Sequence, residues 1–107
     1  MAKTYDLRAF NIAEEVLEER KRQDAKWGEQ NHPDGTGRSI HEHMARAARK
    51  TCEDMFEAGA GAWAYILAEE FWEALAESEP AKLRAELIQV AAVAAAWVEA
   101  IDRRGGE

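Results

Sequence analysis

The sequence contains one cysteine and two prolines, and it has no long apolar run. A single cysteine excludes an intramolecular disulfide, which suits a reducing compartment, and we expect Cys52 to be a small core residue. No run approaches the roughly 18 apolar residues of a membrane span, and the first ten residues, MAKTYDLRAF, lack the apolar core of a signal peptide. These absences predict a cytoplasmic protein with no membrane partner.

Basic residues are also scarce. The 14 Lys and Arg residues stand against 21 Asp and Glu residues, which gives a formal net charge of -7. Binding to a nucleic acid polymer needs clustered Lys and Arg to displace counterions, so we do not expect such a partner. The 107 residues are 47% hydrophobic and 33% charged, which predicts one globular domain over residues 1–107. A chain of this size is near the lower limit for a self-sufficient core, so oligomerisation is expected.

Glycine and proline separate four blocks of helical length. They concentrate in WGEQNHPDGTG (27–37), GAG (59–61), Pro80 and the GG near the C-terminus. The spacing from Ser39 to Glu42 is typical of a capping box, and Pro80 suits the first turn of a helix. No block shows the alternation of a β-strand. We therefore expect an all-α, four-helix bundle with helices over about 6–26, 39–58, 62–78 and 80–103.

The last of these helices contains LIQVAAVAAAWVEAI, which is apolar on nearly every side. Such a helix is either buried all round or packed against a second subunit. Together with the small size of the chain, this pattern favours a homodimer or a tetramer.

Carboxylates recur at helical intervals in two neighbouring helices. Glu70 and Glu73 share one face, and Glu69 reaches it through its own spacing to Glu73. Glu86 and Gln89 repeat the three-residue spacing in the last helix, and the short SEPAK turn would make the two helices antiparallel neighbours. Converging oxygen ligands suit Mg²⁺ or Mn²⁺. The alternative is a solvated helix surface, since glutamate is a good helix former.

Gln89 lies inside an otherwise apolar run. If its amide is buried, it needs a hydrogen-bonding partner, which the acidic residues would supply.

The segments EEFWE (69–73) and ELIQ (86–89) resemble the EExxE…ExxD signature of the MazG-like all-α nucleoside triphosphate pyrophosphohydrolases. The segments EERKRQDAKWGEQNHPDGTG and ELIQVAAVAAAWVEAI resemble the small MazG-related proteins of actinobacteria and their phages. The resemblance covers about residues 12–103. It implies hydrolysis of a (d)NTP between the α- and β-phosphates, which releases the monophosphate and pyrophosphate.

The same resemblance implies roles for individual residues. Glu70, Glu73 and Glu86 correspond to ligands of Mg²⁺, and Glu69 to a further ligand or to the base for the attacking water. Gln89 stands where the family has Asp, so metal affinity should be lower.

Three interpretations of Gln89 are open. The site holds one ion fewer, or another acid such as Asp102 or Glu77 substitutes, or the chain is a catalytically silent relative. We favour a functioning but altered site.

Candidate substrate-binding residues combine positive charge with groups that stack on a base or pair with its edge. They are Arg22, Lys26, Trp27, Gln30, Asn31, His32 and Lys50. Other basic residues near the same positions are Arg20, Lys21, Arg46 and Arg49. Alternatively, the basic side chains pair with nearby acids, Trp27 closes the end of the bundle, and the polar residues form turns.

Two functions follow. The first is a Mg²⁺-dependent nucleotide pyrophosphohydrolase that acts in nucleotide-pool sanitation or control. The second is a catalytically silent helical dimer that acts as an interaction or regulatory module.

Overall fold

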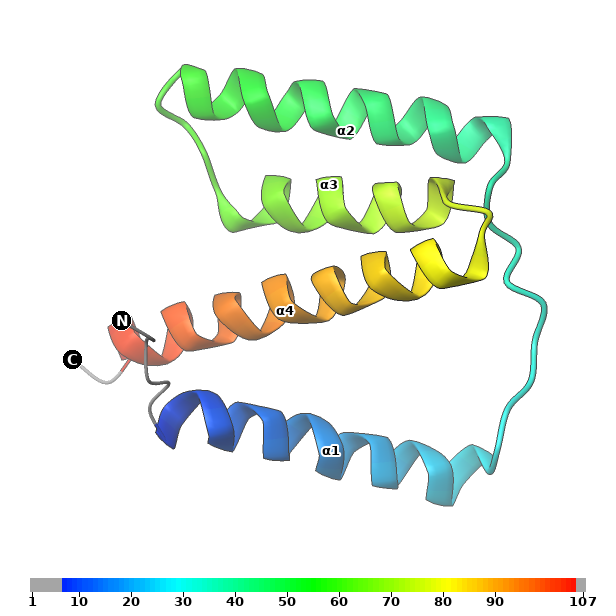
Figure 1. Cartoon of the computed structure of the whole chain (residues 1–107). Helices are drawn as coiled ribbons and strands as arrows, with labels where there is room; N and C mark the ends of the chain where they lie inside the picture. The colour runs from blue at the N-terminus through cyan, green and yellow to red at the C-terminus, as the bar shows by residue number, and fades with distance from the viewer. Residues whose placement is uncertain (1–6, 106–107) are drawn as a thin grey trace, which may run out of the picture. The chain divides into compact units, whose positions relative to one another are not determined.

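The computed structural model describes residues 7–105, and these residues form four helices with no strand (Figure 1). The helices are α1 (Leu7–Trp27), α2 (Ser39–Glu57), α3 (Trp63–Ala76) and α4 (Pro80–Gly105). The all-α prediction is confirmed, and this element content is compatible with a four-helix bundle.

The helix bounds lie close to those predicted. Helix α3 ends two residues earlier than expected, at Ala76, and α4 continues two residues further, to Gly105. The expected start of the first helix at residue 6, and much of the MAKTYDLRAF segment, lie outside the described residues. Among the helices that are described, none is long and apolar enough to cross a membrane.

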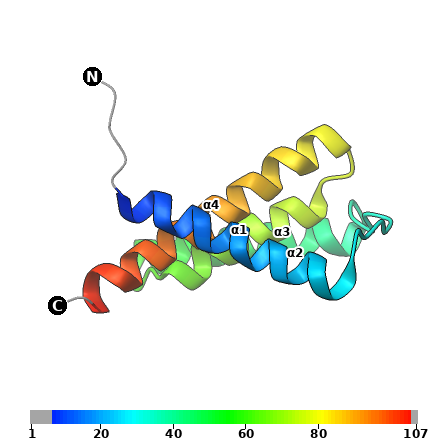
Figure 2. The ribbon, with the colours of Figure 1, turned by 90° about the horizontal axis from the view of Figure 1, so that it is seen from below.

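The described chain forms two compact units. One contains residues 7–33 and 95–105, and the other contains Asp34–Ala94. Helix α4 passes from one unit to the other without a break (Figure 2). The single domain over residues 1–107 stays a prediction.

Within the second unit, α2 and α3 pack side by side and run antiparallel (Figure 1). The predicted capping box from Ser39 to Glu42 is wrong, because the N-cap of α2 is Arg38 in extended conformation. The backbone N–H of Arg38 donates instead to Nδ1 of His41, at 3.3 Å. An imidazole nitrogen therefore takes the accepting role that we expected of a carboxylate.

The segment before α2 closes the C-terminal end of α3. The backbone N–H of Gly37 donates to the carbonyl of Leu75 at 2.8 Å, and Thr36 Oγ1 donates to the carbonyl of Glu77 at 2.6 Å. These bonds satisfy carbonyls that the end of a helix leaves free. Gly37 has φ +78°, and a Cβ there would lie 2.5 Å from Cβ of Ser78. Only glycine fits this close approach.

The buried residues of the described chain are small or medium in size. They are Ile12 in the first unit, and Ala45, Cys52, Ala74 and Leu83 in the second. No large side chain in the described chain is fully buried. On α4, the large apolar side chains of Leu87, Ile88, Val98 and Ile101 are exposed. The two interpretations of this helix, burial all round and packing against a second subunit, stay predictions.

Candidate metal centre

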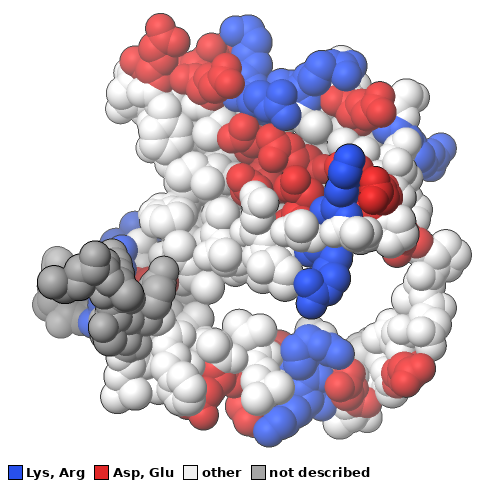
Figure 3. Space-filling model, in the orientation of Figure 1, with Lys and Arg blue, Asp and Glu red and all other residues white. Residues whose placement is uncertain are grey.

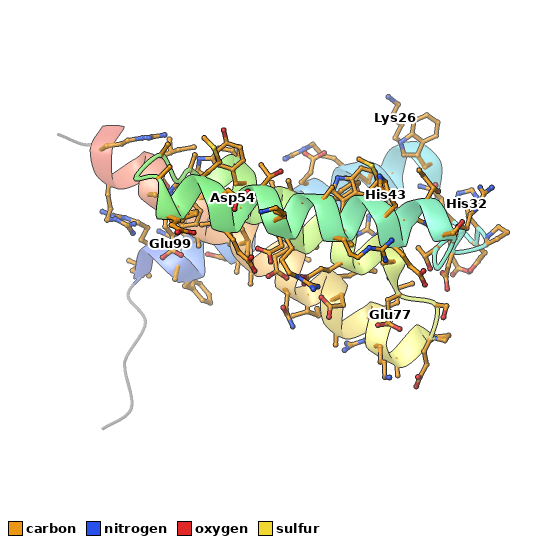
Figure 4. All side chains as sticks on the ribbon, turned by 90° about the horizontal axis from the view of Figure 1, so that it is seen from above. Lys26, His32, His43, Asp54, Glu77 and Glu99 are labelled. Carbon is orange, nitrogen blue, oxygen red and sulfur yellow. The ribbon has the colours of Figure 1, made fainter. Side chains whose placement is uncertain are left out.

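Three glutamates of the second unit converge. Glu70 and Glu73 lie three residues apart on α3, so they share a face, and Glu86 lies in the second turn of α4. Each offers a carboxylate oxygen, and these oxygens all lie within 4.8 Å of one another. The connection between the two helices is only three residues long, from Glu77 to Glu79, which keeps the start of α4 near the end of α3. Figure 4 shows Glu77 at this connection.

Two oxygens of this glutamate cluster (Glu70, Glu73 and Glu86) are enclosed without a hydrogen-bonding partner. They are Oε2 of Glu70 and Oε2 of Glu86. A buried polar atom that lacks a partner costs on the order of 1–3 kcal/mol, and more when it carries charge. A hard divalent cation such as Mg²⁺ or Mn²⁺ would satisfy both atoms, so the residues present fit such an ion.

The electrostatics of the cluster centre on Glu70. Burial raises the pKa of its carboxyl group, and the negative charges of Glu73, Glu86 and Glu69 raise it further, in that order. Both causes disfavour the ionised form, because low solvent access and like charges each make a carboxylate less stable. A bound cation would reverse this effect by attracting the charged form.

This raised pKa leads to a prediction for the metal-free protein. Because the folded-state pKa of Glu70 lies above its unfolded value, the stability it contributes is fully present below the unfolded pKa. That contribution is lost as the pH rises through the folded pKa. We therefore expect Glu70→Gln to be more stable than the wild type near neutral pH, by about 1 kcal/mol, with the difference shrinking in acid. Thermal unfolding in the presence of a chelator, from about pH 4 to about pH 8, measures this.

The matched control is Glu57→Gln, which removes a charge from an exposed position on α2. Its stability relative to the wild type should change much less over the same range. A Glu70→Gln difference that is the same at every pH would contradict the prediction.

Helix α2 contributes a cation to the edge of the glutamate cluster. Arg49 Nη2 donates to Oε1 of Glu73 at 3.2 Å, and Arg49 Nε lies 3.8 Å from Oε1 of Glu69. The buried thiol of Cys52 is also hydrogen-bonded to Glu69. Burial raises the pKa of Cys52, and the carboxylate of Glu69 raises it further, so the thiol stays protonated and can donate this bond.

Glu69 therefore differs from the other three acids. Its carboxylate contacts Arg49 and Cys52 of α2, and it is not a member of the glutamate cluster. Both roles that the resemblance implies for Glu69, a further metal ligand and a base for the attacking water, stay predictions.

A shallow groove of about 270 Å³ opens beside the cluster. Its lining residues are Ala45, Arg49, Glu73, Ala76, Glu77 and Glu86. Figure 3 shows acidic side chains gathered over α3, with Lys and Arg side chains along α2 beside them. A volume of this order is at the low end for small-molecule pockets, so the groove alone suits a phosphate group better than a whole nucleotide.

Gln89, which stands where the MazG-like family has Asp, and the two acids considered as its substitutes lie in different parts of the structure. Gln89 is exposed, so its amide does not need a buried hydrogen-bonding partner. Glu77 lines the groove together with Glu73 and Glu86. Asp102 belongs to the first unit.

Six of the predicted substrate-binding residues lie in the first unit, namely Arg22, Lys26, Trp27, Gln30, Asn31 and His32. All are exposed, and Figure 4 shows Lys26 at the end of α1 and His32 in the loop that follows.

Each of these six has a local partner. Arg22 pairs with Glu19 at 2.7 Å, and Lys26 Nζ lies 4.8 Å from the centre of the Trp27 ring. The side chain of Asn31 donates to Glu29 at 3.1 Å, and His32 Nε2 lies 3.0 Å from Oε1 of Gln30.

Lys50 is the predicted substrate-binding residue in the second unit, and it pairs with Asp54 at 3.0 Å. Such local ion pairs are what the alternative interpretation of the basic residues predicts. A shared substrate site for the seven residues stays a prediction.

Sequence reasoning gave no separate role to Arg49 and treated Cys52 as a core residue only. The signal for both was present in the spacing of α2. Ala45, Arg49 and Cys52 lie at i, i+4 and i+7, so they share one helix face, and two of them are buried. A charged residue on that face has to meet a partner on the helix packed against it.

No protein-family model, no curated protein and no solved structure matches this chain.

Proposed function

We propose that this protein is a divalent-metal-dependent nucleotide pyrophosphohydrolase of MazG-like type. It would cleave a (d)NTP to the monophosphate and pyrophosphate with Mg²⁺ or Mn²⁺, in the cytoplasm, and serve nucleotide-pool sanitation or control. The observation that carries the proposal is the convergence of Glu70, Glu73 and Glu86, with two of their oxygens enclosed and unpartnered. A divalent cation held by these carboxylates would give both oxygens a partner, and this supports the proposal.

The metal explains how an acidic protein could bind a polyphosphate. With a net charge of -7, the chain would repel the substrate, and a divalent ion held by the three glutamates would neutralise charge on the phosphates. The remaining requirement is a positioned water that attacks the α-phosphorus while the bridging P–O bond to the β-phosphate breaks. In this proposal Glu69 accepts the proton of that water, and Cys52 of α2 holds its carboxylate in place.

The departure at Gln89 reduces the charge available to the metal. An amide supplies one neutral oxygen where the family has a carboxylate. Glu77 lines the same groove, so we propose that it is the acid that compensates. This choice favours a substituting acid over a site with one ion fewer and over a catalytically silent relative, and it keeps the site functioning but altered.

We further propose that the chain assembles as a homodimer or a tetramer. Among residues 7–105 the buried side chains are few and are small or medium in size, whereas large apolar side chains are exposed on every helix. Examples on three of the helices are Leu17 on α1, Phe56 on α2 and Ile88 on α4. Apolar exposure on this scale marks a surface for another protein chain.

The test is an assay of pyrophosphate release. The purified protein is incubated with Mg²⁺ and each of a panel of NTPs and dNTPs, and Glu70→Gln is assayed in parallel. We expect release from at least one nucleotide, and a loss of at least about a thousandfold in Glu70→Gln, because the variant lacks a charged ligand of the cation. Analytical ultracentrifugation of the same preparation measures the assembly.

A lack of pyrophosphate release from every nucleotide, in a preparation that is folded, would contradict the enzymatic proposal. It would favour the second candidate, a catalytically silent helical module. The exposed apolar side chains are the observation that supports that candidate, since a protein-binding module needs such a surface.

A further inference from the structure

Arg49 and a divalent cation would both bind the carboxylate of Glu73. Oε1 of Glu73 accepts a hydrogen bond from Arg49 Nη2 at 3.2 Å, and Glu73 is also one of the three glutamates whose oxygens lie within 4.8 Å of one another. Arg49 lines the groove beside Glu73 and Glu86. A guanidinium and a divalent cation at one carboxylate repel each other, so the two do not bind it equally well at once.

The guanidinium is brought to this position by the packing of α2 on α3. Ala45 and Cys52 lie on the same face of α2 as Arg49, and both are buried. Cys52 is hydrogen-bonded to Glu69, and Arg49 Nε lies 3.8 Å from the same glutamate. The buried residues Ala45 and Cys52 therefore keep Arg49 next to the glutamates of α3. The ion pair of Lys50 differs, because its partner Asp54 lies four residues further along the same helix.

The charges indicate what this contact does when no metal is bound. Glu69, Glu70, Glu73 and Glu86 place like charges close together, and Arg49 is the basic residue with ion pairs to two of them in the described part of the chain. Its side chain is 53% exposed, whereas that of Glu73 is 24% exposed. The guanidinium can thus leave toward solvent, while the carboxylate stays in the cluster.

We propose that Arg49 is an internal cation that competes with the divalent metal for Glu73 and thereby sets the metal affinity of the site. The proposal rests on the metal site of the proposed function and adds its regulation. When a metal binds, Arg49 releases Glu73 and becomes free to contact an anionic group in the groove. When the metal leaves, Arg49 returns and offsets part of the repulsion among the acids.

The test measures Mn²⁺ affinity directly, by the electron paramagnetic resonance signal of free Mn²⁺ during a titration without nucleotide. Arg49→Met removes the guanidinium and keeps an unbranched side chain. We expect it to bind Mn²⁺ about two- to fivefold more tightly than the wild type, the range that loss of a partly exposed ion pair implies. Arg49→Lys keeps the charge and should stay closer to the wild type.

Lys50→Met is the matched control. It removes one positive charge from the adjacent residue, whose ion pair is with Asp54 rather than with the acids of α3. It should leave Mn²⁺ affinity nearly unchanged, which separates competition at Glu73 from a general change in net charge. If Arg49→Met does not fold, Arg49→Gln provides the same comparison with a polar side chain.

Weaker Mn²⁺ binding by the Arg49 variants, or a gain no larger than that of Lys50→Met, would overturn this proposal while leaving the metal site intact. A failure of both the wild type and the Arg49 variants to bind Mn²⁺ would overturn the metal site and the proposed function with it. Binding by Arg49→Met alone would support the proposal in its strongest form.

Discussion

Glu86→Gln should abolish the stabilisation of the folded protein by Mn²⁺. In the wild type, a metal concentration about one hundred times the Kd adds about 2.7 kcal/mol of stability. For a domain of this size, that corresponds to a rise in Tm of about 10–20 °C. The glutamine removes one of three charges and one of two unpartnered oxygens, so we expect a loss of affinity on the order of a hundredfold or more. Thermal unfolding with and without Mn²⁺ measures the effect.

The metal-free melting temperature of Glu86→Gln distinguishes a lost ligand from a damaged fold. Removing a carboxylate from a crowded acidic site relieves repulsion, so the variant should be at least as stable as the wild type without metal. Glu57→Gln, at an exposed position on α2, should keep the full response to Mn²⁺. If Glu86→Gln also keeps that response, the three glutamates do not form the metal site.

Gly37→Ala should produce the largest loss of stability among single methyl additions at the glycines that have positive φ. The residue has φ +78°, and an added Cβ would lie 2.5 Å from Cβ and 3.1 Å from Cα of Ser78. The backbone strain costs about 1 kcal/mol, and the overlap with the neighbouring chain costs roughly 1–3 kcal/mol more. The expected decrease in Tm is therefore about 10 °C or more.

Gly35→Ala separates the two contributions. Gly35 also has positive φ, at +70°, but no atom lies within 4 Å of an added Cβ. Gly35→Ala should therefore lose only the stability that backbone strain costs, about 1 kcal/mol. An equal decrease in both variants would show that the chain at Gly37 does not lie against Ser78 in the connection between α3 and α4.

Gly37→Ala also tests how the groove is built. The hydrogen bonds from Gly37 and Thr36 hold the end of α3, and Glu77, which follows that end, lines the groove with Glu73 and Glu86. A change at Gly37 therefore acts on the acidic site through the backbone of α3 rather than through a ligand.

The helices could be predicted because their limits depend on local chemistry. Glycine and proline stand at the breaks, and Pro80 begins α4 as the missing N–H of its ring suggests. The meeting of Glu70, Glu73 and Glu86 could also be anticipated, since a three-residue spacing fixes the face on one helix and a short turn brings the next helix close.

The features that depend on how helices pack could not be predicted. Whether Gln89 is buried depends on what covers α4, and nothing in a run of alanines fixes which side is covered. The contact of Arg49 with Glu69 and Glu73 depends on the register of α2 against α3, which joins residues 20 and 24 positions apart. The cap formed by His41 was missed because sequence rules for helix starts are written for hydroxyls and carboxylates.

The reactivity of the Cys52 thiol can report transient opening of the interface between α2 and α3. The chain has one thiol, it is buried, and its pKa is raised by burial and by Glu69, so alkylating reagents meet an unreactive group in the closed state. Labelling can then proceed only through transient separation of α2 from α3, and its rate follows the population of that opened form. Because Glu69 shares this interface with the glutamates next to it, the labelling rate also records how firmly α3 is held against α2.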